Sequence, residues 1–330
     1  MKDTFFYALR AILPILLMIA AGYAVKCIGP WNQKFFKSLN KLCFHLFLPM
    51  NLFCNIYEIE DLSQTNWKLA GVLFLGTIVC MFVGILAVHL FALKREQKGV
   101  VIQAAFRSNQ AVLGLPLAGA LGGQEAMAFA SIACAVCVPL FSILAVVVLT
   151  ICSGDGKKSL SPVAMVKKIL QNPLIIASGT AIVLVALREA GAAPAYFLKD
   201  TMPSLYKVLT DFGKVASPVM LFVLGTGLDF KATRHLVPQL SLGIALRLIV
   251  SPVLVIGTAL LLRNQLGLTA VEMPTFVAMC ASPVAVSSAV MVQEIGGDDQ
   301  LASQLVIWSS VLSMGTIFLL VFLLRSIGSL

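Results

Sequence analysis

The sequence has few charged residues and very few histidines, and these shortages exclude several classes of protein. Only 12% of its 330 residues are charged, whereas a soluble domain carries about 25%, so an ordinary soluble enzyme is excluded. The three histidines and eight cysteines lack the spacings that hold a metal ion. No pair of carboxylates and no serine–histidine arrangement stands deep in an apolar segment, which argues against an intramembrane hydrolase. No cofactor is expected.

Long apolar segments make up most of the chain instead. Apolar residues amount to 59% of the sequence, and a helix needs about 20 of them in succession to cross a bilayer. We therefore predict an all-α integral membrane protein, with one transmembrane domain over residues 1–330. No convincing cleavage site follows the first segment, so we expect a retained helix rather than a signal peptide. The ten predicted spans are 5–27, 38–57, 67–93, 100–121, 126–151, 172–190, 208–228, 236–262, 270–293 and 301–324.

The basic residues are distributed unevenly between the connections. The net charge is +9, and thirteen basic residues follow odd-numbered spans, against five in the other connections. Because Lys and Arg are retained on the cytoplasmic side, both termini are predicted to lie outside. Orientation in the membrane thus explains the positive charge, and no nucleic-acid partner is expected. The expected location is the bacterial cytoplasmic (inner) membrane, crossed many times.

Two of the apolar segments carry polar residues, glycine and proline where a span should be continuous. One interruption covers residues 107–116 and the other residues 281–288. Each is followed by paired glycines and an acidic residue, at Gly122-Gly123 and at Gly296-Gly297, and a shift of 174 residues superposes both features. Irregular backbone at membrane depth survives only where protein or a cavity covers it. Matched interruptions therefore indicate the binding site of a carrier.

The same match indicates an internal repeat. Repeat one covers residues 1–152 and repeat two residues 169–330, with a short cytoplasmic loop at 153–168 between them. Because five spans per repeat is an odd number, the second copy must enter the membrane upside down. We therefore predict ten transmembrane helices in two inverted five-helix repeats, with crossed broken helices 4 and 9. Chance similarity between apolar segments is the alternative.

The interruptions offer groups that suit a carboxylate. Helix segments that begin at a break present free N–H groups and partial positive charge, and the Asn109 amide adds two donors without burying a cation. On a regular helix Asn109 would share a face with Pro116, and Pro283 would leave the carbonyl of Met279 without a donor. Alternatively, Asn109 only joins helices and the prolines only bend them. The candidate substrate-binding residues are Asn109, Ser108, Gln110, Pro116, Ser282, Pro283, Val284 and Ser287.

Arg107, Arg247 and Asn51 are secondary candidates within apolar segments. A charge inside the membrane is costly and usually functional. Arg107 stands two residues from Asn109, which places it on another face of a regular helix, and it could instead extend to the cytoplasmic surface. Arg247 lies deeper in its segment, either as an anion attractor or as a partner of backbone carbonyls.

Five short motifs are found along the chain: Arg107-x-Asn109, Gly114-Leu115-Pro116, Asn172-Pro173, Ser282-Pro283 and Leu301-Ala302-Ser303. Together they resemble the auxin efflux carrier family, which includes bacterial malate and malonate permeases and the plant PIN-type carriers. The resemblance covers essentially the whole chain. It implies a scaffold part, a mobile transport part, a homodimer, and a substrate site where helices 4 and 9 cross. It also implies that Asn109 is the carboxylate-binding asparagine and Pro283 the crossover proline.

The sequence departs from the plant carriers at two of these positions. Those carriers have a proline just before the asparagine, where this chain has Ser108, and usually a polar residue after the crossover proline, where it has Val284. A small organic anion is therefore expected in preference to an indole acid. The resemblance implies a secondary transporter, a permease or efflux carrier, for small organic carboxylate anions such as malate, malonate or auxin-like acids, with elevator-like alternating access.

The main alternative is a sodium-coupled bile-acid-type organic anion symporter, which shares the inverted-repeat crossover. Such a symporter would need clustered acidic and polar ion ligands, which the apolar segments do not offer. Coupling to protons or to sodium stays open. The expected partners are the small organic anion and the lipid bilayer.

Overall fold

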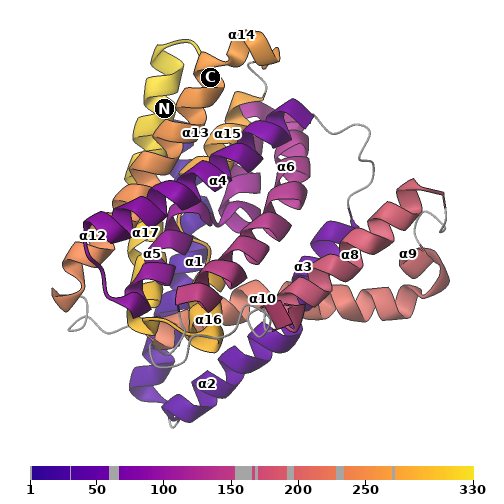
Figure 1. Ribbon diagram of the computed structural model, residues 1–330, viewed down its shortest axis with the longest axis vertical. Helices are drawn as coiled ribbons and strands as arrows, with labels where there is room; N and C mark the ends of the chain where they lie inside the picture. Colours follow the sequence, from indigo (N-terminus) through magenta and orange to yellow (C-terminus); the bar gives the residue numbers. More distant parts are fainter. Residues whose placement is uncertain are drawn as a thin grey trace.

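The computed structural model describes residues 2–29, 31–58, 67–152, 166–167, 170–191, 197–227, 234–269 and 272–330. Nearly all of this part of the chain is helical, and both chain ends lie near the same end of the molecule (Figure 1). Apart from residues 166–167, the predicted loop 153–168 lies outside the described residues. In chain order the helices are α1 (Lys2–Ile28), α2 (Gln33–Leu42), η1 (Cys43–Phe47), α3 (Leu48–Tyr57), α4 (Trp67–Leu90), α5 (Arg95–Phe106), η2 (Gln110–Gly114), α6 (Leu115–Cys152), α8 (Pro173–Glu189), α9 (Phe197–Thr201), α10 (Pro203–Thr226), α12 (Val237–Ala245), η3 (Leu246–Val250), α13 (Ser251–Leu261), α14 (Arg263–Leu266), α15 (Met273–Ala281), α16 (Ser287–Ile295) and α17 (Asp299–Ser326).

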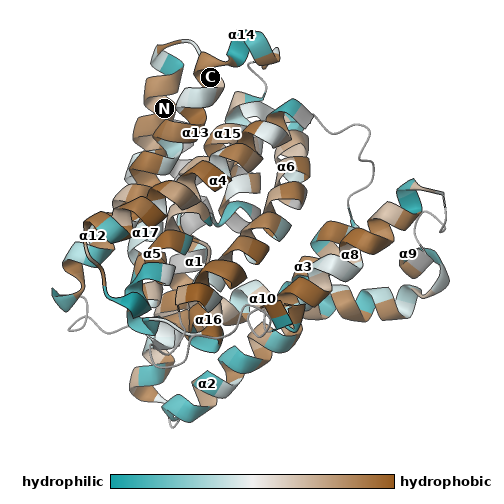
Figure 2. Ribbon diagram, in the orientation of Figure 1, coloured by the Kyte–Doolittle hydropathy of each residue, from teal (hydrophilic) through white to brown (hydrophobic). Residues whose placement is uncertain are grey.

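Several of these helices are long and apolar enough to cross a membrane. The predicted all-helical fold is therefore confirmed, whereas the count of ten spans and the inverted repeat stay predictions. Of the other predicted spans, 5–27 lies within α1, which has 27 residues, whereas α8 has 17 residues and α5 and α15 stop after 12 and 9. Figure 2 shows apolar residues along nearly every helix, with hydrophilic residues prominent on α2 and α14. Within the described residues, the five candidate spans are Lys68–Leu90, Leu117–Cys152, Pro203–Thr226, Val237–Leu261 and Asp299–Ser326.

The first helix group consists of α1, α2, η1, α3, α8 and α10. Within it α1 packs along α10, and α3 packs on both α8 and α10. The α1–α10 contact requires glycine, because a Cβ atom on Gly22 would lie 1.9 Å from the carbonyl oxygen of Phe222. A Cβ atom on Gly225 would lie equally close, 1.9 Å, to the carbonyl oxygen of Ile19. Small residues thus let two helix backbones touch, as is common between membrane helices.

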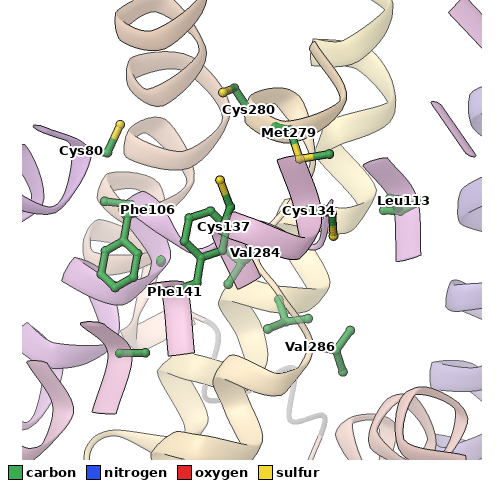
Figure 3. Close-up of a cluster of buried hydrophobic side chains, with 14 of the residues drawn as sticks. Cys80, Phe106, Leu113, Cys134, Cys137, Phe141, Met279, Cys280, Val284 and Val286 are labelled. Atoms are coloured by element: carbon green, nitrogen blue, oxygen red, sulfur yellow. The ribbon is translucent and has the colours of Figure 1, made fainter. Parts of the chain in front are cut away.

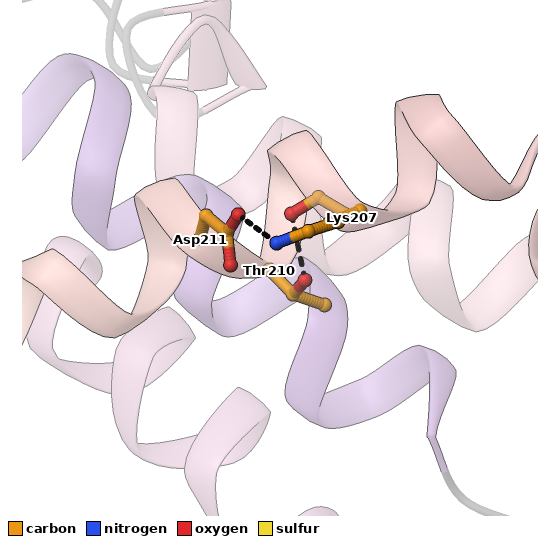
Figure 4. A network of polar contacts seen from close by, with 3 residues as sticks. All are labelled: Lys207, Thr210 and Asp211. Atoms are coloured by element: carbon orange, nitrogen blue, oxygen red, sulfur yellow. Dashed lines mark hydrogen bonds and ion pairs between the residues drawn. The ribbon is translucent and has the colours of Figure 1, made fainter.

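An exposed ion pair lies on the surface of α10. Lys207 Nζ lies 2.6 Å from Asp211 Oδ2, and the Thr210 hydroxyl donates to the Lys207 carbonyl at 2.8 Å (Figure 4). The two charged side chains are 74% and 55% exposed. An exposed pair of this kind contributes little to stability, so it belongs to the solvated surface of the helix.

The second helix group consists of α4, α5, η2, α6, α12, η3, α13, α15, α16 and α17. Here α4 packs on α5, and α15 packs on α6 and α13. Figure 3 shows the apolar side chains that gather between them, among them Phe106, Phe141 and Met279. The rings of Phe106 and Phe141 are 6.2 Å apart. Cys137 and Cys280 are buried free thiols in the same cluster, where they act as small apolar side chains.

Two helices of the second group are interrupted. α5 ends at Phe106, and the chain leaves the helix until η2 begins at Gln110. In the same way α15 ends at Ala281, and α16 begins at Ser287. Residues 107–109 and 282–286 of the two interruptions therefore lie between helix segments, whereas Gln110, Pro116 and Ser287 stand at or near the start of the segments that follow.

The two breaks touch through their backbones. The Asn109 N–H donates to the Pro283 carbonyl at 2.8 Å, and the Ala285 N–H donates to the Arg107 carbonyl at 3.2 Å. These two bonds form an isolated antiparallel β-bridge between Ser108 and Val284. Asn109 and Pro283 are 174 residues apart, which is the shift that superposes the two motifs.

The far ends of the interrupted helices also lie together. The Asp298 N–H, just after α16, donates to the Glu96 carbonyl at the start of α5 at 3.0 Å. The Thr275 hydroxyl, at the start of α15, donates to the Ala126 carbonyl of α6 at 3.3 Å. Because each helix begins where the other ends, the two interrupted helices run antiparallel and cross at the bridge.

Three of the four paired glycines that follow the breaks occupy backbone conformations that suit glycine. Gly123 has a φ of 71°, and Gly296 and Gly297 have φ values of 124° and 135°. Residues with a Cβ atom rarely adopt such angles. The matching glycine pairs of the sequence therefore mark sharp changes of chain direction at the end of each interrupted helix.

Candidate functional site

A cavity of about 80 Å³ lies beside the bridge, between the two helix groups. Helices α3 and α10 line one side of it, and the two breaks and α6 line the other. Its polar lining residues are Asn51, Asn55, Arg107, Ser108, Asn109, Gln110, Ser142, Ser217 and Ser287. Among the described residues the lining thus contains amides, hydroxyls and one guanidinium, but no carboxylate.

Non-helical backbone at the first break turns Arg107 and Asn109 toward the same cavity. Arg107 has φ −90° and ψ 102°, and Asn109 has φ −83° and ψ 48°. We predicted that Arg107 lies on a different face from Asn109; that prediction assumed a regular helix and is wrong. The face that Asn109 was predicted to share with Pro116 stays a prediction. Arg107 is 5% exposed, so it does not extend to a surface. The side chain of Pro116 lies outside the described part of the structure.

Asn109, Ser108 and Gln110 hold buried polar atoms that lack hydrogen-bond partners. The three residues are only 6%, 4% and 1% exposed. Within the described structure Asn109 Nδ2, Ser108 Oγ and both polar side-chain atoms of Gln110 make no hydrogen bond. A buried group left in this state costs about 1–3 kcal/mol, unless water or a ligand in the neighbouring cavity supplies the partner. Three consecutive residues therefore offer unused hydrogen-bonding capacity to whatever fills the cavity.

Arg107 adds a buried positive charge beside these amides. Its Nη2 donates to Ser287 Oγ at 2.8 Å, and its Nη1 contacts the sulfur of Met291. Both partners are neutral side chains of α16. The ion pairs Arg188–Glu189 and Lys207–Asp211 do not involve it. Since an isolated buried charge is costly, a site of this kind favours an anion.

The ends of the interrupted helices add to this preference. Gln110 begins η2 and Ser287 begins α16, and both residues line the cavity. The first N–H groups of a helix have no partner within the helix and carry partial positive charge. The cavity therefore receives two helix N-termini as well as one guanidinium.

Arg247 donates hydrogen bonds to backbone carbonyls at the C-terminal end of α15, just before the second break. It is 1% exposed, and its Nε donates to the Ser282 carbonyl at 2.9 Å. Its Nη2 donates to the carbonyls of Met279, at 3.3 Å, and Cys280. The Met279 carbonyl, predicted to lack a donor, is therefore satisfied. Arg247 lines a separate cavity of about 20 Å³. Two roles were predicted for it, an anion attractor or a partner of backbone carbonyls, and the structure supports the second.

Ser282, Pro283 and Val284 build the crossing but do not line the larger cavity. The Ser282 hydroxyl donates to the Ala278 carbonyl at 2.6 Å, and the Val284 N–H donates to Ser309 Oγ at 3.1 Å. Pro283 contributes its carbonyl to the bridge. Of the predicted residues, the structure brings Asn51, Arg107, Ser108, Asn109, Gln110 and Ser287 together around the cavity.

Sequence reasoning missed Asn55, Ser142 and Ser217. Asn55 stands one helical turn after Asn51, and its Nδ2 donates to Asn51 Oδ1 at 3.1 Å. That spacing on one helix face was a usable signal. Ser142 and Ser217 are single hydroxyls in apolar segments, and nothing near them in the sequence distinguishes them from other serines.

Comparison with known proteins agrees with this picture of a membrane carrier. An uncharacterized transporter of Methanocaldococcus jannaschii is 28% identical over 287 residues, which cover 85% of this chain and 87% of the relative. An uncharacterized transporter of Methanothermobacter thermautotrophicus is 24% identical over 92% of this chain and 94% of its own length. A Rhizobium meliloti protein named "Putative malonate transporter" is 23% identical over 96% of this chain and 95% of its own.

The family comparison covers almost the entire sequence. Residues 7–321 match the model of the family described as "Membrane transport protein". This confirms the resemblance drawn from the motifs around Asn109 and Pro283. The chain belongs to the membrane transport protein family, that of the auxin efflux carriers, and is a membrane transporter.

Proposed function

We propose that this protein is a secondary transporter for small organic carboxylate anions, which it binds in the cavity beside the crossing. One observation carries the proposal: the unpartnered amide nitrogen of Asn109 and the guanidinium of Arg107 face one cavity whose described lining has no carboxylate. A carboxylate accepts hydrogen bonds on two oxygens and bears the charge that this site lacks. Charge-assisted bonds of this kind are about twice as strong as neutral ones.

The size of the cavity favours small anions. At roughly 10–15 Å³ per water molecule, a cavity of about 80 Å³ would hold only a handful of waters. Malonate, malate and lactate have few heavy atoms, whereas an indole acid is considerably larger. The name of the Rhizobium meliloti relative points to the same substrate class.

The position of the cavity supports elevator-like alternating access in the cytoplasmic membrane. The cavity lies between the two helix groups, so a shift of the second group against the first would carry the bound anion with it. The contact of Asn109 with Pro283, its equivalent under the 174-residue shift, supports two inverted five-helix repeats and ten spans.

The lining also bears on the sodium-coupled alternative. A sodium ion is held by oxygen ligands, usually with a carboxylate among them to offset its charge. The described lining of the larger cavity offers Arg107 and no Asp or Glu, which favours an anion alone at this place. Flux of equal rate with and without sodium would separate the two transport modes.

Uptake by proteoliposomes tests the proposal. Purified protein reconstituted into liposomes should take up radiolabelled malonate or lactate, and Asn109→Ala should remove most of that uptake. Asn264→Ala is the matched control, because Asn264 is exposed on α14, away from the cavity. Equal uptake by the wild type and Asn109→Ala, with both well folded, would contradict the proposed site.

A further inference from the structure

We infer that this carrier works as an exchanger of monovalent organic anions, because Arg107 leaves the empty site with a positive charge. The inference rests on the proposed function and goes beyond it. It concerns which step of the transport cycle is slow, and therefore which mode of transport the protein performs.

Arg107 is fixed to the part of the protein that crosses at the bridge. Its carbonyl accepts the Ala285 N–H at 3.2 Å, and its guanidinium is held by Ser287 and Met291 of α16. Backbone and side chain are thus both attached to the second break. Any movement of the crossed helices relative to the first helix group must carry this charge along.

The other described polar groups of the cavity cannot neutralise Arg107, because they are amides and hydroxyls. The carboxylates that follow along the chain are Glu294, in the last turn of α16, and Asp298, which stands after α16 and caps α17. Glu294 stands three residues after Met291 and seven after Ser287, about 5 Å and about 10 Å along a helix, and it makes no hydrogen bond or ion pair with Arg107 in the described structure. It accepts a hydrogen bond from Asn40 Nδ2 at 3.4 Å, and Asp298 accepts one from Gln97 Nε2 at 3.1 Å. These carboxylates are therefore engaged away from the cavity.

The charge of the site follows by simple addition. An empty site carries one positive charge, and a site that holds a monovalent anion carries none. A charged group moves through the membrane interior at a high cost, so the loaded carrier should reorient faster than the empty one. Exchange of one anion for another uses only the loaded step, whereas net transport also needs the empty step. A bound dianion would leave a charge on the loaded site, so a dicarboxylate is expected to move as its hydrogen form.

Membrane voltage separates the two steps. One elementary charge that crosses a potential of 100 mV changes an equilibrium by about 50-fold. The neutral loaded carrier should not respond to voltage, whereas the charged empty carrier should. If the site were neutral when empty, the loaded carrier would bear the charge of the anion. The rate of exchange would then depend on voltage, and the return of the empty carrier would not.

The experiment uses proteoliposomes and radiolabelled lactate. Uptake into liposomes preloaded with unlabelled lactate should be at least about 10-fold faster than uptake into liposomes without it. A potassium diffusion potential of 100 mV should leave the exchange rate unchanged within about 2-fold, and should slow net uptake when the interior is negative. Equal uptake with and without internal lactate, or an exchange rate that follows voltage, would overturn the inference. Absence of uptake under both conditions would instead reject the proposed function.

Two variants test the assignment to Arg107. Arg107→Lys keeps the charge and should keep the preference for exchange. Arg107→Gln removes it, so the advantage of internal lactate should shrink and the exchange rate should become sensitive to voltage. An Arg107→Gln carrier that still exchanges lactate without voltage dependence would show that the charge lies elsewhere. The wild-type voltage measurement decides the inference even where a variant is poorly folded.

Discussion

The backbone N–H of Asn109 donates a 2.8 Å hydrogen bond to the carbonyl of Pro283. This bond satisfies the backbone at the break, while the Asn109 side-chain nitrogen is left without a partner. One residue therefore both holds the crossing together and presents a free donor to the cavity. Asn109 therefore contributes both to the fold and to the proposed binding site, whereas the contacts of Arg247 and of the glycines of α1 and α10 are with backbone groups of the protein.

Arg247→Met should destabilise the protein without touching the larger cavity. The substitution removes the donors for the carbonyls of Ser282, Met279 and Cys280. Each buried carbonyl left unsatisfied costs about 1–3 kcal/mol, so we expect a total loss of about 3 kcal/mol or more. Thermal unfolding in detergent measures the change. Arg95→Met, at an exposed position of α5, is the control, and equal melting temperatures for the two variants would count against the proposed role of Arg247.

Gly22→Val should separate α1 from α10. A Cβ atom at this position would meet the Phe222 carbonyl at 1.9 Å, so the helices must move apart. Overpacking of this kind typically costs about 1–3 kcal/mol and sometimes more. Gly71→Val is the matched control, since nothing lies within 4 Å of a Cβ atom there. Melting temperatures measured side by side should fall for Gly22→Val only; a fall of equal size in both would contradict the close contact.

A cross-link between Asn40 and Glu294 should stop transport. Asn40 lies on α2 of the first helix group and Glu294 on α16 of the second, and their side chains are 3.4 Å apart. Asn40→Cys combined with Glu294→Cys, in a protein with Cys27→Ser, can be joined by a short methanethiosulfonate cross-linker, whose disulfide bonds a reductant breaks. Uptake should then fall to background and return on reduction. Full uptake by the cross-linked protein would mean that these two groups do not move apart during transport.

The sequence was most informative where the backbone is irregular. Polar residues and prolines in two apolar segments indicated breaks, and the glycine pairs after them indicated that the two segments are equivalent copies. The same reasoning brought Asn109 and Pro283 together, as equivalent positions of a repeat. These are local signals, and each has a direct physical cause in the backbone.

Side-chain directions could not be predicted in the same way. Arg107 was assigned to the wrong face because the helix stops before it, and a break changes the direction of every side chain within it. Arg247 needed knowledge of which carbonyls lie across from it, and these come from a different segment of the chain. Ser142 and Ser217 line the cavity only because distant helices pack together.

Ligand-dependent thermal stability of the purified wild-type protein tests the central claim most directly. A ligand that binds the folded state raises the melting temperature by mass action. Malonate, malate or lactate at millimolar concentration should stabilise the wild type, and the same anions should leave Asn109→Ala unchanged. Indole-acetate should stabilise the wild type less than the small anions do. The absence of any shift with the small anions, or shifts of equal size in Asn109→Ala, would contradict the account of a carboxylate site at the crossing.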